Sequence, residues 1–181
     1  MPSAAALHEL IQRQRGPADR LYAIVDSARD PDLARAAFER FGLERWSLFP
    51  ADTDASMVPV APYLVPVPFE PKYPFTTSGF LEAWTARLGG CSGILFASKA
   101  EPRLVWEHCR NLFQVVDEDG KEFYFRFYDP RVVRPLLSTL AADQVREFFG
   151  PIGRYFIEGQ AGEMVVCRAD EGTVRIERVA V

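Results

Sequence analysis

The chain has 181 residues, a formal net charge of −4 and a pI near 5.3, and 48% of its residues are hydrophobic. This length fits one domain, which we expect to span residues 1–181. The acidic balance argues against nucleic acid as the main partner, because neutralising phosphates requires a basic surface. No apolar run reaches transmembrane length, so we expect no contact with a membrane.

The sequence also argues against several kinds of chemical site. Cys91, Cys109 and Cys167 lie far apart without a CxxC spacing, which disfavours a zinc site and a disulfide framework. There is no GxSxG, GxxxxGK[ST] or GxGxxG motif. The first residues show no charged segment ahead of a hydrophobic one, so no secretory signal is visible. We therefore expect a cytoplasmic protein with no enzymatic activity, no metal and no cofactor.

Helix and strand patterns alternate in the N-terminal part, about 1–116. Residues 3–15 carry the apolar stripe of an amphipathic helix, and the apolar run 21–25 is typical of a buried strand. A helix beginning at Asp30-Pro31 and a strand over 45–49 follow. This order predicts a mixed α/β fold in which a parallel βαβ unit forms the core of the sheet, with flanking helices.

The segment 50–78 is rich in proline, which predicts an extended, irregular chain with one edge strand near 63–67. Beyond it, residues 78–88 have the pattern of a helix that ends at two glycines. Residues 94–97 are typical of a third buried strand, and a further helix begins at Glu101-Pro102.

A predicted antiparallel hairpin of 113–116 and 122–128, joined by a turn at 117–120, leads from the N-terminal part into the remaining part, about 117–181. The alternation of residues within 123–128 predicts that Phe123, Phe125 and Phe127 lie on one face of its second strand. Helical segments over 130–149 follow. Three short strands then predict a small C-terminal meander, and they span 152–157, 164–168 and 174–179.

Arg126, Asp129 and Arg131 are the strongest constellation of polar residues in the chain. Two interpretations are open. The three side chains could form a buried or half-buried ion pair that fixes the hairpin to the next helix. They could instead form a charged docking site framed by Tyr124 and Tyr128, since arginine and tyrosine are typical anchors of protein interfaces.

Carboxylates at a strand end support a catalytic alternative. Asp26 and Asp30 follow the first strand, where ligands of α/β proteins often bind. A small hydrolase or transferase that uses them would need a deep pocket and a carboxylate whose pKa is raised by burial. Acidic loops and helix caps also account for both residues.

Six motifs follow one another along the chain: LYAIVD at 21–26, LF at 48–49, APYLV at 61–65, GILFAS at 93–98, RFYDPR at 126–131 and FFGP at 148–151. This ordered series resembles the type VI secretion adaptor family, the effector chaperones. The family's recurrent positions would fall on Tyr22, Asp26, Pro62, Tyr63, Leu64, Ser98, Arg126, Asp129, Pro130, Arg131, Gly150 and Pro151.

The resemblance implies an adaptor in the cytoplasm that binds a toxin effector and helps to load it onto the valine-glycine-repeat (VgrG) spike protein. We expect an apolar groove with a charged rim to hold the effector. The residues expected to contact it are Tyr63, Phe69, Tyr124, Arg126, Tyr128 and Arg131. A related alternative is an immunity protein, which would inhibit the toxin that it binds.

Overall fold

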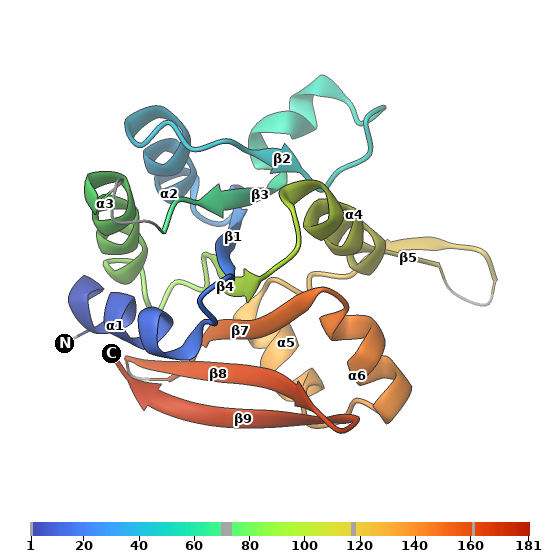
Figure 1. Ribbon diagram of the computed structural model, residues 1–181. Helices are drawn as coiled ribbons and strands as arrows, with labels where there is room; N and C mark the ends of the chain where they lie inside the picture. The colour runs from blue at the N-terminus through green and yellow to red at the C-terminus, as the bar shows by residue number, and fades with distance from the viewer. Residues whose placement is uncertain (1, 70–73, 117–118, 161) are drawn as a thin grey trace.

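A computed structural model describes residues 2–69, 74–116, 119–160 and 162–181. Seven antiparallel strands form the central sheet of this part of the chain (Figure 1). In spatial order they are β2 (Trp46–Ser47), β3 (Pro62–Val67), β1 (Arg20–Asp26), β4 (Gly93–Ser98), β7 (Ile152–Glu158), β8 (Glu163–Asp170) and β9 (Thr173–Ala180).

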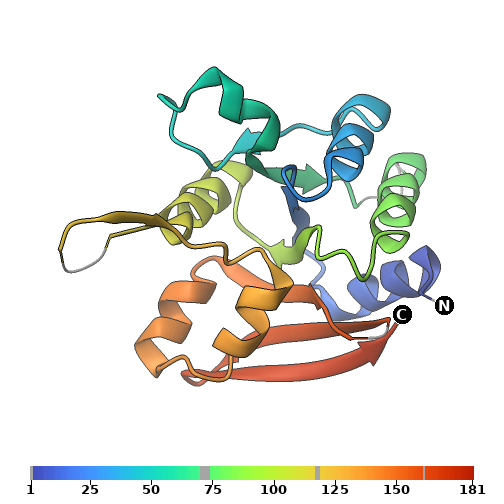
Figure 2. The same cartoon turned by 180° about the vertical axis from the view of Figure 1, so that it is seen from behind.

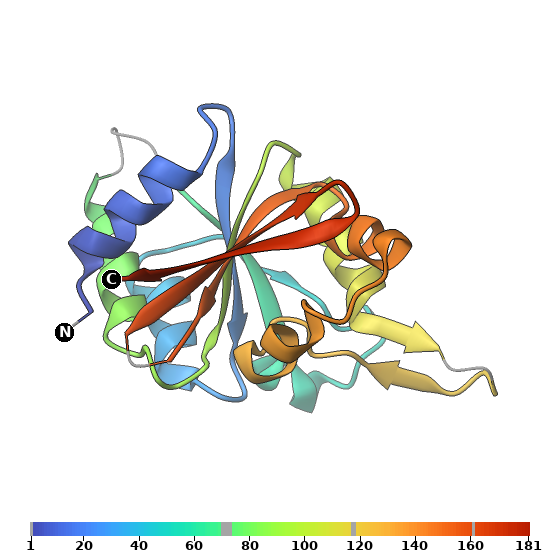
Figure 3. The ribbon, with the colours of Figure 1, turned by 90° about the horizontal axis from the view of Figure 1, so that it is seen from below.

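Helices cover both faces of this sheet (Figures 2 and 3). The first face is covered by α1 (Ala4–Gln14), α2 (Pro31–Arg35), η1 (Ala36–Arg40) and α3 (Pro74–Thr85). The second is covered by α4 (Pro102–Phe113), α5 (Pro130–Leu136) and α6 (Ala142–Phe149). Successive residues of β1 point to opposite faces, so Ala23 packs in one hydrophobic core and Tyr22 in the other. No helix in the described part is long and apolar enough to cross a membrane.

The mixed α/β class is confirmed, but the predicted parallel βαβ core is wrong. β1 and β2 run in the same direction, and β3 lies between them and is antiparallel to both. In the same way, β1 lies between β3 and β4. α2 and α3 therefore connect strands that are not neighbours, and every pairing in the sheet is antiparallel. The order of elements along the chain does not show which strand lies between two others in the sheet.

β3 contains two prolines although it is not the outermost strand. Pro62 and Pro66 pair with Asp26 and Tyr22 of β1. On its other side, β3 pairs with β2 only at Tyr63 and Leu64. Most of that side of β3 is therefore not paired with another strand. The prolines lack an N–H group, but no hydrogen bond of a ladder is lost there, so both are tolerated.

A hairpin of β5 (Gln114–Val116) and β6 (Glu122–Tyr124) projects from the body of the molecule (Figures 1 and 3). The hairpin was predicted, although its second strand is shorter than expected. After Tyr124 the chain turns, and the N–H of Phe127 donates to the carbonyl of Phe125. Phe127 is fully buried whereas Phe123 is half-exposed, so the predicted common face of Phe123, Phe125 and Phe127 is wrong. Asp117 and Glu118 of the predicted turn lie outside the described residues.

The predicted C-terminal meander is present as β7, β8 and β9, but it is not a separate small sheet. β7 pairs with β4, with Phe156 opposite Leu95, so the three strands continue the central sheet. η2 (Ala55–Val60) lies in the proline-rich segment.

Candidate functional site

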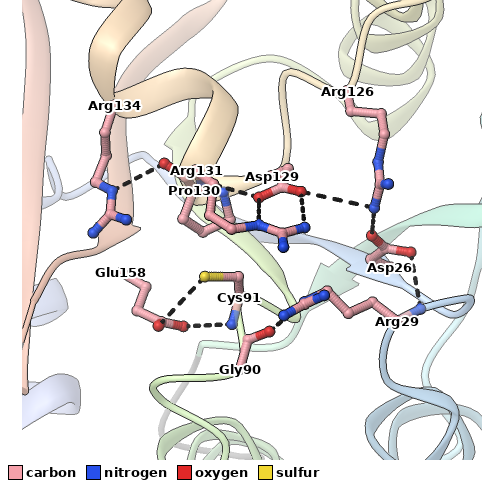
Figure 4. A network of polar contacts seen from close by, with 10 residues as sticks. All are labelled: Asp26, Arg29, Gly90, Cys91, Arg126, Asp129, Pro130, Arg131, Arg134 and Glu158. Atoms are coloured by element: carbon pink, nitrogen blue, oxygen red, sulfur yellow. Dashed lines mark hydrogen bonds and ion pairs between the residues drawn. The ribbon is translucent and has the colours of Figure 1, made fainter.

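Two aspartates and two arginines form a network where β1 ends and α5 begins (Figure 4). We call Asp26, Arg126, Asp129 and Arg131 the arginine–aspartate network. Arg131 binds Asp129 through two contacts, Nε to Oδ1 at 2.9 Å and Nη2 to Oδ2 at 2.6 Å. Arg126 donates to the carboxylate of Asp26, and its Nη2 lies 3.8 Å from Oδ2 of Asp129. The network therefore ties the end of the hairpin to both β1 and α5.

The carboxylates of the network are buried and its guanidinium groups are at the surface. The side chains of Asp26 and Asp129 are 3% exposed, compared with 44% for Arg126 and 49% for Arg131. Burial opposes ionisation of Asp129, but hydrogen bonds from Arg131 and the positive charge of that residue outweigh it and lower the pKa of the carboxyl group. The ion pair suggested by the sequence is thus present, and a docking role for its arginines stays a prediction.

The low pKa of Asp129 predicts how stability changes in acid. A carboxylate whose pKa is lower in the folded state stabilises the fold above its unfolded pKa of about 3.9, and this contribution is lost as the pH falls through the folded value. Asp129→Asn should cost about 1–3 kcal/mol at pH 7. Below about pH 4, wild-type stability should fall more steeply than that of the variant. Urea unfolding at pH 7, 4 and 3 tests this, and parallel pH profiles would contradict it.

Further polar contacts surround the network (Figure 4). The carboxylate of Glu158 on β7 accepts the N–H groups of Gly89 and Cys91 at 2.7 and 3.1 Å. Arg134 donates to the carbonyl of Pro130 at 3.0 Å. Burial and the charge of Glu158 raise the pKa of the Cys91 thiol, which favours the protonated and poorly nucleophilic form. The Glu158 contacts join the end of β7 to the loop before β4, and the Arg134 contact lies within α5. The Cys91 thiol is therefore not an activated nucleophile.

Asp30 does not have the properties that the catalytic alternative requires. Its carboxylate accepts the N–H of Leu33 at 2.8 Å, the hydroxyl of Ser92 at 2.7 Å and Nε of Arg87 at 3.2 Å. Burial opposes ionisation, but these contacts outweigh it and lower the pKa of Asp30. A catalytic acid there would need the opposite shift. Within the described residues, no group of three or more His, Cys, Asp or Glu side chains could hold a metal ion.

The six residues expected to contact a partner do not share one surface. The side chains of Tyr63, Phe69 and Tyr128 are buried in the body of the protein. The hydroxyl of Tyr63 donates to the carbonyl of Val58 at 2.6 Å, and the ring of Phe69 stacks on that of His8. The other three, Tyr124, Arg126 and Arg131, are half-exposed or exposed. Tyr124 ends β6, whereas Arg126 and Arg131 both lie next to Asp129 at the start of α5.

Most recurrent positions of the family resemblance have structural contacts. The Tyr22 hydroxyl donates to the carbonyl of Ala100, and that of Ser98 to the carbonyl of Pro151, each at 2.7 Å. Pro130 is the first residue of α5 and is buried. Among the other recurrent positions, Pro62 and Leu64 are buried in β3, and Gly150 ends α6 against the ring of His108. These contacts give the motif residues a structural role in holding the fold together.

Sequence reasoning selected Tyr124 as a contact residue but missed the other apolar side chains exposed on the hairpin. We call Val115, Val116, Phe123 and Tyr124 the hairpin surface; their exposed fractions are 39%, 63%, 44% and 54%. Val115 and Phe123 are paired on one face of the hairpin, and Val116 and Tyr124 lie on the other. The ring of Tyr124 stacks on that of Phe113, with centroids 4.6 Å apart, and lies 5.7 Å from the ring of Phe49. These contacts fix the base of the hairpin to the body. The signal available in the sequence was the presence of apolar residues in both strands of the predicted hairpin.

An apolar groove lies next to the hairpin surface. It has a volume of about 370 Å³, and its lining includes Trp46, Phe49, Val58, Trp106 and Arg110. The two tryptophan rings meet edge to face, with centroids 5.8 Å apart, and the guanidinium of Arg110 lies over the ring of Trp106. Phe49 lines the groove and also contacts Tyr124, so the groove adjoins the hairpin face that carries Tyr124.

Comparison with known proteins assigns part of the chain to a family. A family model described as "Domain of unknown function (DUF4123)" matches residues 21–147. This region runs from β1 into α6, and it contains the arginine–aspartate network, the hairpin and the groove. No curated protein and no solved structure matches the chain.

Proposed function

The chain belongs to the DUF4123 family, and we propose that it is a non-enzymatic adaptor of type VI secretion in the bacterial cytoplasm. In this role it binds a toxin effector and helps to load it onto the VgrG spike protein. The motif series from LYAIVD to FFGP supports the secretion context. The hairpin surface is the observation that carries the binding role.

The exposed side chains of the hairpin favour burial against another protein. Each buried Å² of apolar surface contributes about 25 cal/mol to association before the costs of binding. An isolated two-stranded hairpin is marginally stable by itself, so contact with an effector would also order it. Its projection from the body makes both of its faces accessible to a large partner (Figure 3).

The groove provides the apolar centre that a protein-binding surface needs. Interfaces derive most of their affinity from a few aromatic and arginine side chains in a desolvated centre. Trp46 and Trp106 line such a centre, with Arg110 as its charged neighbour. We expect a large apolar side chain of the effector to enter the groove, and an acidic residue beside it to meet Arg110 and fix the orientation.

Co-expression with a candidate toxin effector tests the proposal. The wild-type chain should co-purify with the toxin, and Val116→Glu combined with Phe123→Glu should weaken binding by about 100-fold or more. Val132→Glu is the matched control, since this exposed valine lies on α5, outside the hairpin surface.

Three results would count against the proposal. Recovery of two folded but separate proteins would reject the adaptor role. Equal binding by the hairpin variant and Val132→Glu would reject this surface. Complete inhibition of the toxin at equimolar ratio would favour the immunity alternative.

A further inference from the structure

Three arginines lie side by side across β7, β8 and β9. Arg168 is directly opposite Arg175 in the β8–β9 pairing. Tyr155 is opposite Cys167, which places the preceding Arg154 next to Arg168 on the neighbouring strand. All three side chains line a cavity of about 480 Å³. Like charges on directly opposing strand positions destabilise a sheet, so this row needs a physical reason.

The row lies on the sheet face that α1 covers, because Arg154 and Arg168 are each two residues from Phe156 and Val166, which belong to the core on that face. Arg154 is opposite Ala97 of β4, which is opposite Leu21 of β1, and both apolar residues are buried in the core beneath the helices. Gln14, the last residue of α1, lines the same cavity. The cavity is therefore lined by residues of β7, β8 and β9 and by the last residue of α1.

The positive charges of the row are poorly balanced by acidic side chains. Across the described part of the chain, no carboxylate forms an ion pair with Arg154 or Arg168, and Nε of Arg154 is buried without a hydrogen-bond partner. Arg175 has a single exposed ion pair, with Asp170 at 3.6 Å. Glu177, the acidic residue of the cavity, accepts a hydrogen bond from Gln14 at 3.0 Å. An anion in the cavity would offset the repulsion.

We propose that this cavity binds a small molecule bearing a phosphate or diphosphate group. The planar guanidinium of arginine donates two parallel hydrogen bonds to phosphate oxygens, and three such groups on adjacent strands suit a multiply charged anion. The volume lies in the range typical of small-molecule sites. The residues of the row lie outside the segment 21–147 that matches the family, and the site is independent of effector binding.

Thermal unfolding with pyrophosphate as the probe tests the site, with ionic strength held constant by sodium chloride. At ten times the dissociation constant, pyrophosphate should raise the melting temperature of the full chain by about 3–6 °C. Arg168→Gln should melt at or above the temperature of the ligand-free wild type, because like-charge repulsion is relieved. It should also lose most of the pyrophosphate response, and Arg175→Gln should behave in the same way.

Arg178→Gln is the matched control, because Arg178 lies on β9 opposite Val165 and therefore points to the other face of the sheet. This variant should keep the full response. The proposal is overturned if pyrophosphate stabilises wild type and Arg168→Gln equally, or if Arg178→Gln loses the response to the same extent. A response equal to that produced by sodium chloride alone would also overturn it.

Discussion

Gly93→Ala is expected to prevent folding. Gly93 has a φ of +149° and pairs with Val25 in the middle of the sheet. A Cβ added there would lie 1.9 Å from the carbonyl oxygen of Ile24, which belongs to the backbone of β1. Neither strand can retreat without breaking the ladder, so the cost should exceed about 4 kcal/mol, a large part of the stability of a typical domain. Soluble yield, circular dichroism and urea unfolding measure the effect.

Gly42→Ala is the control for Gly93→Ala, because it introduces backbone strain without steric overlap. Gly42 also has a positive φ, +61°, but an added Cβ would meet nothing within 4 Å. This substitution should cost only about 1–2 kcal/mol, the ordinary penalty for a left-handed residue. A Gly93→Ala variant that is as stable as Gly42→Ala would show that β1 and β4 can separate locally, contrary to our expectation.

Local elements of the fold could be predicted from sequence, and their pairing could not. The apolar stripe near the N-terminus and the apolar runs of β1 and β4 depend on neighbouring residues, and each forms the expected helix or strand. The position of β3 between β1 and β2 depends on contacts distant in sequence. The importance of Gly93 depends on the same contacts, because Ile24 approaches it only after β1 and β4 pair.

The candidate site shows the same division. Arg126, Asp129 and Arg131 lie within six consecutive residues, so their interaction was visible in the sequence. Asp26 lies 100 positions before Arg126, and nothing in the local pattern joins the two. Tyr128 was expected at a docking surface because it stands beside these charges. It is buried instead, because the chain turns after β6 and directs this ring into the core.

The contact of Arg126 with Asp26 should be strongly asymmetric in its effect on stability. Arg126→Met leaves the buried Asp26 carboxylate without its cation, so we expect a loss of about 2–4 kcal/mol in the free energy of unfolding. Asp26→Asn leaves a guanidinium that is already 44% exposed and can reach water, so about 1 kcal/mol is expected. The double variant should lie close to Asp26→Asn, because it contains no unpaired buried charge. Urea unfolding of the four proteins gives the coupling energy, and equal losses in both single variants would contradict the asymmetry.

The same variants decide between the two interpretations of the network. If Arg126 contacts the effector, Asp26→Asn keeps the guanidinium at the surface and should bind like the wild type. Arg126→Met should then bind at least about 10-fold more weakly in conditions where both variants are folded. If instead both bind the effector as the wild type does, the arginine–aspartate network holds the hairpin in place without touching the partner. Effector recognition would then rest on the apolar side chains that the hairpin and the groove present.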